Sequence, residues 1–181
     1  SGNVGTGWKY MAPEKDTVVT SRGCRARIRM IENGCLRTVF RVETDMRIPL
    51  CADSRRKSRS RRKSGLKIVS EIALGRNSRR VDVKTFVDNR ARDHRLRVMF
   101  PTISGAEKSC AEMPYDVVAR KIGIQDTSGW VEHDDGTRPM LNFVDVSDGK
   151  AGFAFMGTGL CEYQVFRNSK RTLAVTLIRA F

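Results

Sequence analysis

The stretch RARIRMIENGCLRTVFRVET, residues 25–44, decides the class of fold. Apolar residues alternate with arginines from Arg25 to Met30, and the dipeptide Asn33-Gly34 follows, which accepts positive φ in a tight hairpin turn. The alternation then resumes from Leu36 to Thr44. A period of two residues is typical of a strand with one polar and one apolar face. The stretch therefore predicts a β-hairpin.

The same alternation recurs along most of the chain, separated by turn signals such as Asp148-Gly149 and Asn168-Ser169. No long stretch has a convincing helical period. About ten short strands joined by turns predict an all-β fold, an antiparallel β-sandwich. Further strands are predicted at residues 66–74, 81–87, 96–100, 116–122, 140–146, 152–156, 162–166 and 171–178.

Length and composition suit one globular domain. With 181 residues and 40% hydrophobic content, the chain is long enough to bury one core, and we expect a single domain over residues 1–181. Neither a secretory leader nor an apolar run of the ~20 residues needed to span a membrane is recognisable. We therefore expect a soluble protein without a membrane partner.

The five cysteines are scattered and form no C-x-x-C pair. An odd, dispersed set fits neither a disulfide framework nor a zinc knuckle, so free thiols are predicted. Free thiols are typical of a reducing compartment, and we expect a cytoplasmic location.

The net charge of +14 is concentrated in one segment. The run SRRKSRSRRKSG, residues 54–65, holds seven basic residues and no acidic one, which predicts a basic, flexible, solvated loop. The arginines of residues 77–102 alternate with apolar residues and are interpreted as the solvated face of a sheet. Nucleic acid is expected to bind only non-specifically, because the basic strands lack the interleaved aromatic residues of an RNA-binding sheet. A basic β module that binds nucleic acid or acidic glycans remains the alternative function.

Candidate catalytic and metal-binding groups are few. His94 and His133 are the two histidines, and neither has neighbours at metal-ligand spacing. The carboxylates Asp134-Asp135 and Asp148 lie in predicted turns, whereas Asp145 lies within a predicted strand. Glycoside hydrolysis needs a positioned pair of carboxylates, and these positions favour turn-forming roles instead. We predict no catalytic residue and no metal site in this chain.

Two aromatic residues are candidate platforms for a sugar ring. The faces of Trp130 and Tyr163 suit the apolar C–H side of a pyranose, but packing in the core or at a sheet edge is the simpler interpretation of either residue.

Several sequence blocks, in order, resemble the bacterial α-mannosidases of glycoside hydrolase family 38. The similarity extends over nearly the whole chain and lies in the β-rich region that follows the catalytic domain of that family. The blocks that carry it are SRRVDVKT (residues 78–85), DHRLRV (93–98), EMPYDVV (112–118), NFVDVSDG (142–149) and LAVTLIR (173–179).

The resemblance implies a C-terminal β-sandwich region of galactose-mutarotase-like (supersandwich) architecture. Family members are zinc-dependent, retaining enzymes acting on α-mannosides, with the nucleophile and the zinc ligands in upstream parts. The chain is therefore expected to be a non-catalytic, inactive domain that holds no cofactor, packs against the catalytic domain of the same polypeptide and contacts the α-mannoside through it. The resemblance also implies that Arg179 points toward the substrate pocket. Trp130, a candidate from its aromatic face alone, is the second possible substrate contact.

The resemblance further implies that the family's sequences continue beyond the segment matching Leu173 to Arg179. We therefore expect an unpaired sheet edge at residues 171–181, through which the chain would self-associate.

Overall fold

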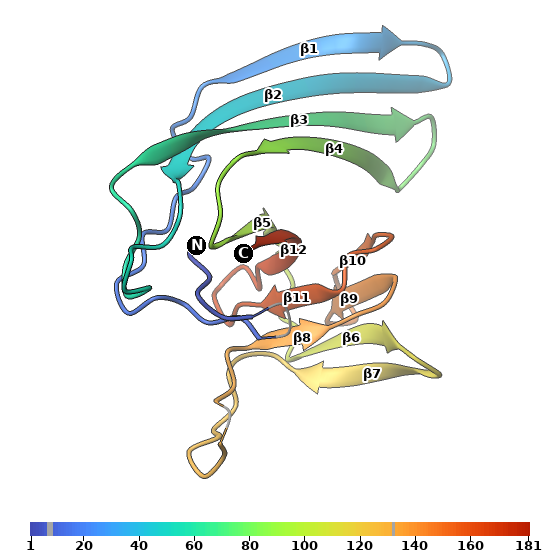
Figure 1. Cartoon of the computed structure of the whole chain (residues 1–181). Helices are drawn as coiled ribbons and strands as arrows, with labels where there is room; N and C mark the ends of the chain where they lie inside the picture. Colours follow the sequence, from blue (N-terminus) through green and yellow to red (C-terminus); the bar gives the residue numbers. More distant parts are fainter. Residues whose placement is uncertain (7–8, 132) are drawn as a thin grey trace. The chain divides into compact units, whose positions relative to one another are not determined.

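The structure of the chain is a computed structural model that describes residues 1–6, 9–131 and 133–181. Within these residues the chain forms strands, turns and bends but no helix (Figure 1). The strands form three antiparallel sheets, in the orders β1-β2-β3-β4, β10-β9-β6-β7 and β5-β12-β11-β8. The predicted all-β, antiparallel fold is thereby confirmed. Across the described ranges, no helix has the length and apolar character that crossing a membrane requires.

The chain divides into two compact units. The first comprises Ser1–His94 together with Ala180–Phe181, and the second comprises Arg95–Arg179. The expectation that residues 1–181 act as a single domain stays a prediction.

The first unit is built around a four-stranded meander. Each strand pairs with the next along the sequence, and Ala26 lies opposite Thr44 in the first pair, so the predicted hairpin is confirmed. The strands are β1 (Ala26–Asn33), β2 (Arg37–Pro49), β3 (Lys63–Gly75) and β4 (Val81–Asn89).

The turn of the first hairpin differs from the prediction. Neither Asn33 nor Gly34 has a positive φ. A bulge between Met30 and Glu32 shifts the register, and the Gly34 amide donates to the Arg37 carbonyl at 2.9 Å. The bulge and the three-residue loop replace the tight two-residue turn that the Asn-Gly dipeptide indicated.

The two faces of this sheet differ in chemistry. On one face, the Glu43 carboxylate lies 2.9 Å from Nη2 of Arg29 and 3.4 Å from Nε of Arg41. On this sheet alternate arginines therefore cover a solvated face. The opposite face carries an apolar row of cross-strand neighbours that is largely exposed within the chain. The row consists of Met30, Phe40, Ile72 and Val83.

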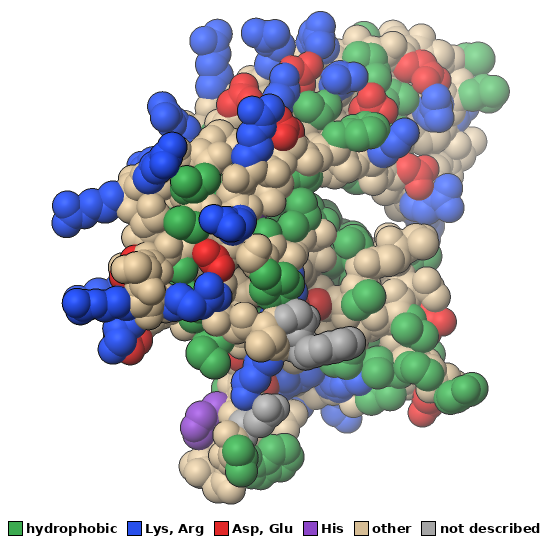
Figure 2. Space-filling model, viewed as in Figure 1, with side chains coloured by type: hydrophobic (Ala, Val, Ile, Leu, Met, Phe, Trp, Pro, Cys, Tyr) green, Lys and Arg blue, Asp and Glu red, His purple; other side chains and the backbone are tan. Residues whose placement is uncertain are grey.

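The basic segment, residues 54–65, is only partly the solvated loop that its composition predicts. Arg55, Arg61 and Arg62 are exposed, and Lys and Arg side chains are prominent on the face seen in Figure 2. Arg59, in contrast, is buried, with only 3% of its side chain exposed, and β3 already begins at Lys63. The flexibility of the segment stays a prediction.

Two oxygen acceptors explain why Arg59 departs from the prediction. Its Nη2 donates to the Pro49 carbonyl at 3.2 Å, and its Nη1 lies 3.7 Å from the Asp16 carboxylate. A guanidinium group can be buried where oxygen atoms meet its charge and its aliphatic stem is packed. Those acceptors are distant in sequence, so the charge run alone does not reveal them.

The second unit is a small sandwich of two sheets around a shared apolar core. Aromatic rings extend the core, with the Phe100 and Phe153 centroids 5.1 Å apart. One sheet contains β6 (Lys108–Met113), β7 (Asp116–Lys121), β9 (Phe143–Ser147) and β10 (Gly152–Met156); the other contains β5 (His94–Phe100), β8 (Thr137–Pro139), β11 (Glu162–Val165) and β12 (Leu173–Ala180). Both sheets contribute buried residues: Ala111, Val144 and Val146 from the first, and Tyr163, Val165, Leu173 and Val175 from the second.

Sequence periodicity misses two of these strands. β6 consists largely of small and charged residues, which have weak strand propensity. β8 has only three residues and ends in Pro139, which a strand tolerates at the edge of a sheet. Both strands are therefore specified by their neighbours rather than by their own composition.

The predicted unpaired edge at residues 171–181 is wrong. β12 lies between β5 and β11 in its sheet, and Leu173 and Val175 are paired with Val165 and Tyr163. The edge strands of this sheet are β5 and β8. The backbone groups of an interior strand are already used by its neighbours. Self-association of the chain stays a prediction.

Candidate functional site

A polar cluster on the sheet β5-β12-β11-β8 is centred on the carboxylate of Glu162. Oε1 of Glu162 accepts hydrogen bonds from Oγ1 of Thr176 at 2.6 Å and from Nη1 of Arg95 at 3.1 Å. Oε2 accepts a hydrogen bond from Nη1 of Arg179 at 3.3 Å. Nη1 of Arg95 also donates to Oγ1 of Thr137 at 3.2 Å. One carboxylate on β11 thus holds two guanidinium groups, one from β5 and one from β12.

Strand register explains why Glu162 and Thr176 lie on the same face. Tyr163 lies opposite Val175, and both point into the core, so Glu162 and Gln164 lie on the other face of β11. On that face Gln164 accepts a hydrogen bond from Nη1 of Arg97 at 2.7 Å. The cluster is therefore a polar layer on the outer side of the sheet whose inner side forms the core.

The cluster is partly shielded from water and rich in positive charge. The side chain of Arg95 is 4% exposed, and those of Glu162 and Arg179 are 17% and 15% exposed. Two arginines share the carboxylate of Glu162. Charge-assisted hydrogen bonds are strong in such surroundings and fix the orientation of a guanidinium group. Arg95 is consequently an exception to the solvated arginine face predicted for residues 77–102.

Arg179, the arginine that the resemblance directs toward the substrate pocket, belongs to this cluster. It lies near the end of β12 and is oriented by Glu162. Its role in substrate binding stays a prediction.

Trp130 lies outside the polar cluster, in the Trp130 loop, residues 122–136 between β7 and β8, which extends away from its sheets in Figure 1. Its residue exposure is 71%, and Val131 beside it is fully exposed. Hydrophobic side chains are visible at the tip of the loop in Figure 2. The core-packing interpretation of Trp130 is therefore wrong. For Tyr163 that interpretation is confirmed, since its ring is buried and its hydroxyl lies 3.0 Å from Oγ of Ser109.

The base of the Trp130 loop is closed by an ion pair between Asp134 and Arg138. Nη1 and Nη2 of Arg138 donate to Oδ1 and Oδ2 of Asp134 at 2.6 and 2.7 Å. The amides of Gln125 and Gly136 also donate to this carboxylate, each at 2.8 Å. The hydrogen bonds from Arg138 hold the pKa of Asp134 well below its usual range. Gly136 has the positive φ that the turn prediction required.

The other candidate carboxylates accept local hydrogen bonds. Asp135 accepts a hydrogen bond from the Thr137 amide at 2.8 Å, and Asp145 accepts one from the Ser147 hydroxyl at 2.8 Å. Asp148 accepts hydrogen bonds from three amides, which lower its pKa to about 2. Asp135 and Asp148 thus have the turn-forming roles that the sequence favours, whereas Asp145 lies within β9, in the strand that was predicted for it.

The two histidines belong to different units. His94 is buried at the start of β5, where burial and the nearby Arg59 charge lower its pKa, whereas His133 is exposed on the Trp130 loop. All five cysteines are free, as predicted. In the part of the chain that the structure describes, no three His, Cys, Asp or Glu side chains gather as metal ligands would. The described residues therefore do not fit the zinc ion that the resemblance associates with the parent enzymes.

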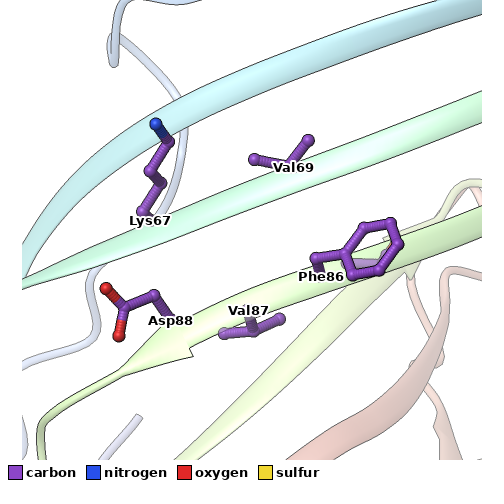
Figure 3. A pocket seen from close by; sticks show the side chains of 6 residues that line it. Lys67, Val69, Phe86, Val87 and Asp88 are labelled. Atoms are coloured by element: carbon purple, nitrogen blue, oxygen red, sulfur yellow. The ribbon is translucent and has the colours of Figure 1, made fainter.

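A shallow depression of about 520 Å³ lies between β3 and β4 (Figure 3). Val69 and Phe86, which are cross-strand neighbours, contribute apolar surface, and Lys67 lies opposite Asp88. A single carboxylate without a second acid or base does not supply the pair that glycoside hydrolysis needs. We therefore do not assign chemistry to this depression.

Comparison with known proteins gives the family. The family model described as glycosyl hydrolases family 38 C-terminal domain matches residues 2–181. The chain belongs to this family. The recognition of a family 38 C-terminal region from sequence blocks is thereby confirmed.

Individual relatives of this family 38 domain are much longer than the chain. A putative mannosylglycerate hydrolase from Halalkalibacterium halodurans is 26% identical over 193 residues, which cover 99% of the chain and 21% of that protein. The crystal structure of an α-mannosidase from Enterococcus faecalis V583 matches with a TM-score of 0.89 and 28% identity, over 99% of the chain and 21% of its own. A second family 38 structure from Enterococcus faecalis matches with a TM-score of 0.86 and 26% identity. The match covers 99% of the chain and 22% of that structure. The family 38 domain thus spans about a fifth of the length of these relatives, and its β-sandwich fold is confirmed.

The sequence analysis did not identify Glu162 as the partner of Arg179, nor Arg95 as the second arginine that binds Glu162. A weak signal exists, because Arg95 and Arg97 in one strand, and Glu162 and Gln164 in another, repeat with a period of two. The period indicates which face each residue occupies but not which strands are adjacent. The cluster becomes visible only once β5, β12 and β11 are placed side by side.

Proposed function

We propose that the chain is the non-catalytic β-sandwich domain of a zinc-dependent, retaining α-mannosidase, and that it packs against the catalytic domain of the same polypeptide. Support comes from the family match over residues 2–181 and from an α-mannosidase that shares this fold over a fifth of its length. In this proposal the zinc ion and the nucleophile belong to the catalytic domain. The parent enzyme acts on α-mannosides and resides in the cytoplasm, a location that suits the five free cysteines.

The observation that carries the proposal is the fixed guanidinium of Arg179. Glu162 engages one of its nitrogen atoms at 3.3 Å, and a guanidinium group presents its N–H donors in a fixed planar fork that suits sugar hydroxyl groups. A donor group that is already oriented loses little side-chain entropy when it binds a substrate. We assign to Arg179 a contact with the mannoside, and to Glu162 the positioning of Arg179.

The experiment uses the full-length polypeptide that contains this chain, with an aryl α-mannoside as substrate. Arg179→Lys keeps the positive charge but removes the planar guanidinium group. We expect it to lower kcat/KM about tenfold with little change in Tm. Arg167→Lys, a change at an exposed arginine outside the cluster, is the matched control. Equal kcat/KM for Arg179→Lys and the control would contradict the role of Arg179.

The inactivity of the isolated chain has its own test. The 181-residue chain is assayed with and without added zinc, and no turnover of the aryl α-mannoside is expected. Turnover that disappears when a residue of this chain is mutated would overturn the non-catalytic assignment.

A second candidate function is a basic β module that binds nucleic acid or acidic glycans. It is favoured by one observation, the exposed side chains of Arg55, Arg61 and Arg62 within the basic segment. Exposed cations attract polyanions by counterion release whatever the fold beneath them.

A further inference from the structure

One face of the sheet β1-β2-β3-β4 carries uncharged side chains from all four strands, which lie side by side in Figure 1. We call it the apolar face. Met30 lies opposite Phe40, Phe40 opposite Ile72, and Ile72 opposite Val83, so the apolar row runs across the whole sheet. Side chains alternate between the two faces of a strand. In these four strands, all of which the structure describes, every Asp, Glu, Lys and Arg therefore lies on the other face.

Much of the apolar face is open to solvent. Its large exposed side chains have residue exposures between 43% and 63% and belong to Ile28, Met30, Phe40, Leu74, Val81 and Val83. Single exposed apolar residues are common on proteins, but these side chains are cross-strand neighbours and form one continuous patch. A continuous apolar patch of this kind marks a surface that another layer of protein covers.

The opposite face of the same sheet does not need such a cover. Its side chains meet one another in ion pairs, as between Glu43 and Arg29 at 2.9 Å, and remain hydrated. An antiparallel sheet commonly keeps one face in water and packs the other on a second layer. The difference between the two faces therefore indicates which side of this sheet docks.

Charge and length decide between the candidate occupants of the apolar face. Two copies of the chain, each with a net charge of +14, repel each other, which disfavours a second copy. Nucleic acid is disfavoured because the strands place no cation on this face to meet its phosphates. The matched relatives are about five times longer than the chain, so most of a family polypeptide is available to cover the sheet. A layer in the same polypeptide also has a high effective concentration at the sheet.

We propose that the apolar face is an interface within the full-length polypeptide, covered by an apolar layer from outside residues 1–181. This rests on the proposed function, because it takes the chain to be one domain of a longer enzyme. It adds the docking surface, which belongs to the first unit, whereas the Arg179 cluster lies on a sheet of the second. Phe40 and Ile72 occupy the two central strands of the interface.

The first test measures the reaction of introduced thiols with N-ethylmaleimide in the full-length polypeptide. Val83→Cys lies on the apolar face of β4, and Lys84→Cys, its neighbour on the charged face, is the matched control. Relative to the urea-denatured polypeptide, we expect Val83→Cys to react at least about 100-fold more slowly and Lys84→Cys less than about tenfold more slowly. Met30→Cys, with Arg29→Cys as its control, repeats the comparison on β1 and serves if Val83→Cys fails to fold.

The second test identifies the layer that covers the face. Phe40→p-benzoylphenylalanine places a photoreactive aromatic group in the central strand β2 of the full-length polypeptide. Irradiation is expected to cross-link it to a segment of the same molecule outside residues 1–181. Mass spectrometry of the digested product locates that segment.

Each result decides for or against the interface. Slow reaction of Val83→Cys at every protein concentration, with a cross-link outside residues 1–181, supports it. Equal rates for Val83→Cys and Lys84→Cys in the folded polypeptide overturn it, as does a cross-link to residues 95–179. Protection that is lost on about hundredfold dilution, with cross-links between molecules, would assign the face to a second copy and overturn it.

Turnover of an aryl α-mannoside by the same polypeptide separates this interface from the proposed function. Turnover together with a freely reactive Val83→Cys would overturn the interface and leave the mannosidase assignment intact. A covered face in a polypeptide without turnover would support the interface and contradict the mannosidase assignment.

Discussion

Asp134 and Arg138 form a bidentate ion pair that closes the base of the Trp130 loop, with N–O distances of 2.6 and 2.7 Å. The pair lies four residues apart in sequence, and the same carboxylate also accepts the amides of Gln125 and Gly136. Both side chains are largely shielded from solvent. A surface loop with an exposed Trp is thereby tied to the end of β7 and the start of β8.

Asp134→Asn is expected to lower the free energy of unfolding by about 2 kcal/mol, because it removes a charge-assisted pair and leaves Arg138 partly buried without its partner. Urea denaturation measures the loss. Amide hydrogen exchange is expected to accelerate in residues 123–136 and to stay unchanged in β9 and β10. Asp126→Asn, at an exposed carboxylate in the same loop, is the control, and an equal effect there would contradict the special role of Asp134.

The same carboxylate should make the loop sensitive to acid. The pKa of Asp134 is lower in the folded chain than its ordinary value of about 3.9, so its contribution is fully present above that value and is lost as pH falls through the folded pKa. We expect loop protection to be constant near neutral pH and to decline only in strong acid. Asp134→Asn should abolish this decline, and a decline that persists in the variant would contradict it.

Asp148 provides a direct titration test. Amides of Gly105, Lys150 and Ala151 donate to its carboxylate at 2.6 to 2.9 Å and lower its pKa to about 2. Carboxyl carbon NMR should therefore show Asp148 ionised until well below pH 3.9, the approximate value for a free aspartate. A pKa near that ordinary value would mean that these amide contacts do not persist in solution.

Glu162→Gln is expected to cost about 3 kcal/mol of unfolding free energy, because the buried guanidinium of Arg95 would lose its counter-charge. Glu107→Gln is the matched control, since Glu107 also meets two arginines but is 59% exposed. The control should cost less than about 1 kcal/mol. Thermal or urea unfolding measures both, and equal costs would show that the Glu162 cluster is not shielded as described.

The exposed arginines of the basic segment and its buried Arg59 are expected to have different roles, and substitutions can distinguish these roles. Replacing Arg55, Arg61 and Arg62 with Ser should leave Tm nearly unchanged and reduce the salt slope of binding to duplex DNA by about 2 to 3 units. Arg59→Ala should instead lower the unfolding free energy by about 2 kcal/mol, because the Pro49 carbonyl and Asp16 lose their partner. Salt-resistant DNA binding that survives the triple replacement would indicate that the strand arginines form a recognition surface.

The sequence by itself determined the features that depend on near neighbours. Alternation over residues 25–44 and 81–87 specified strands, and the glycines at 136 and 149 specified turns with positive φ. Blocks of residues in order specified the family. These signals are local because side-chain direction in a strand and turn conformation are set within a few residues.

Only the tertiary structure decided which distant side chains meet and which are buried. Glu162 binds Arg95 and Arg179 because β12 lies between β5 and β11, an order that no single strand encodes. Arg59 is buried because the Pro49 carbonyl and the Asp16 carboxylate receive its guanidinium group, and the charge run does not reveal either acceptor. The physical reason is that burial of a charge depends on the oxygen atoms that the fold brings to it, whereas periodicity describes only the face from which a residue points.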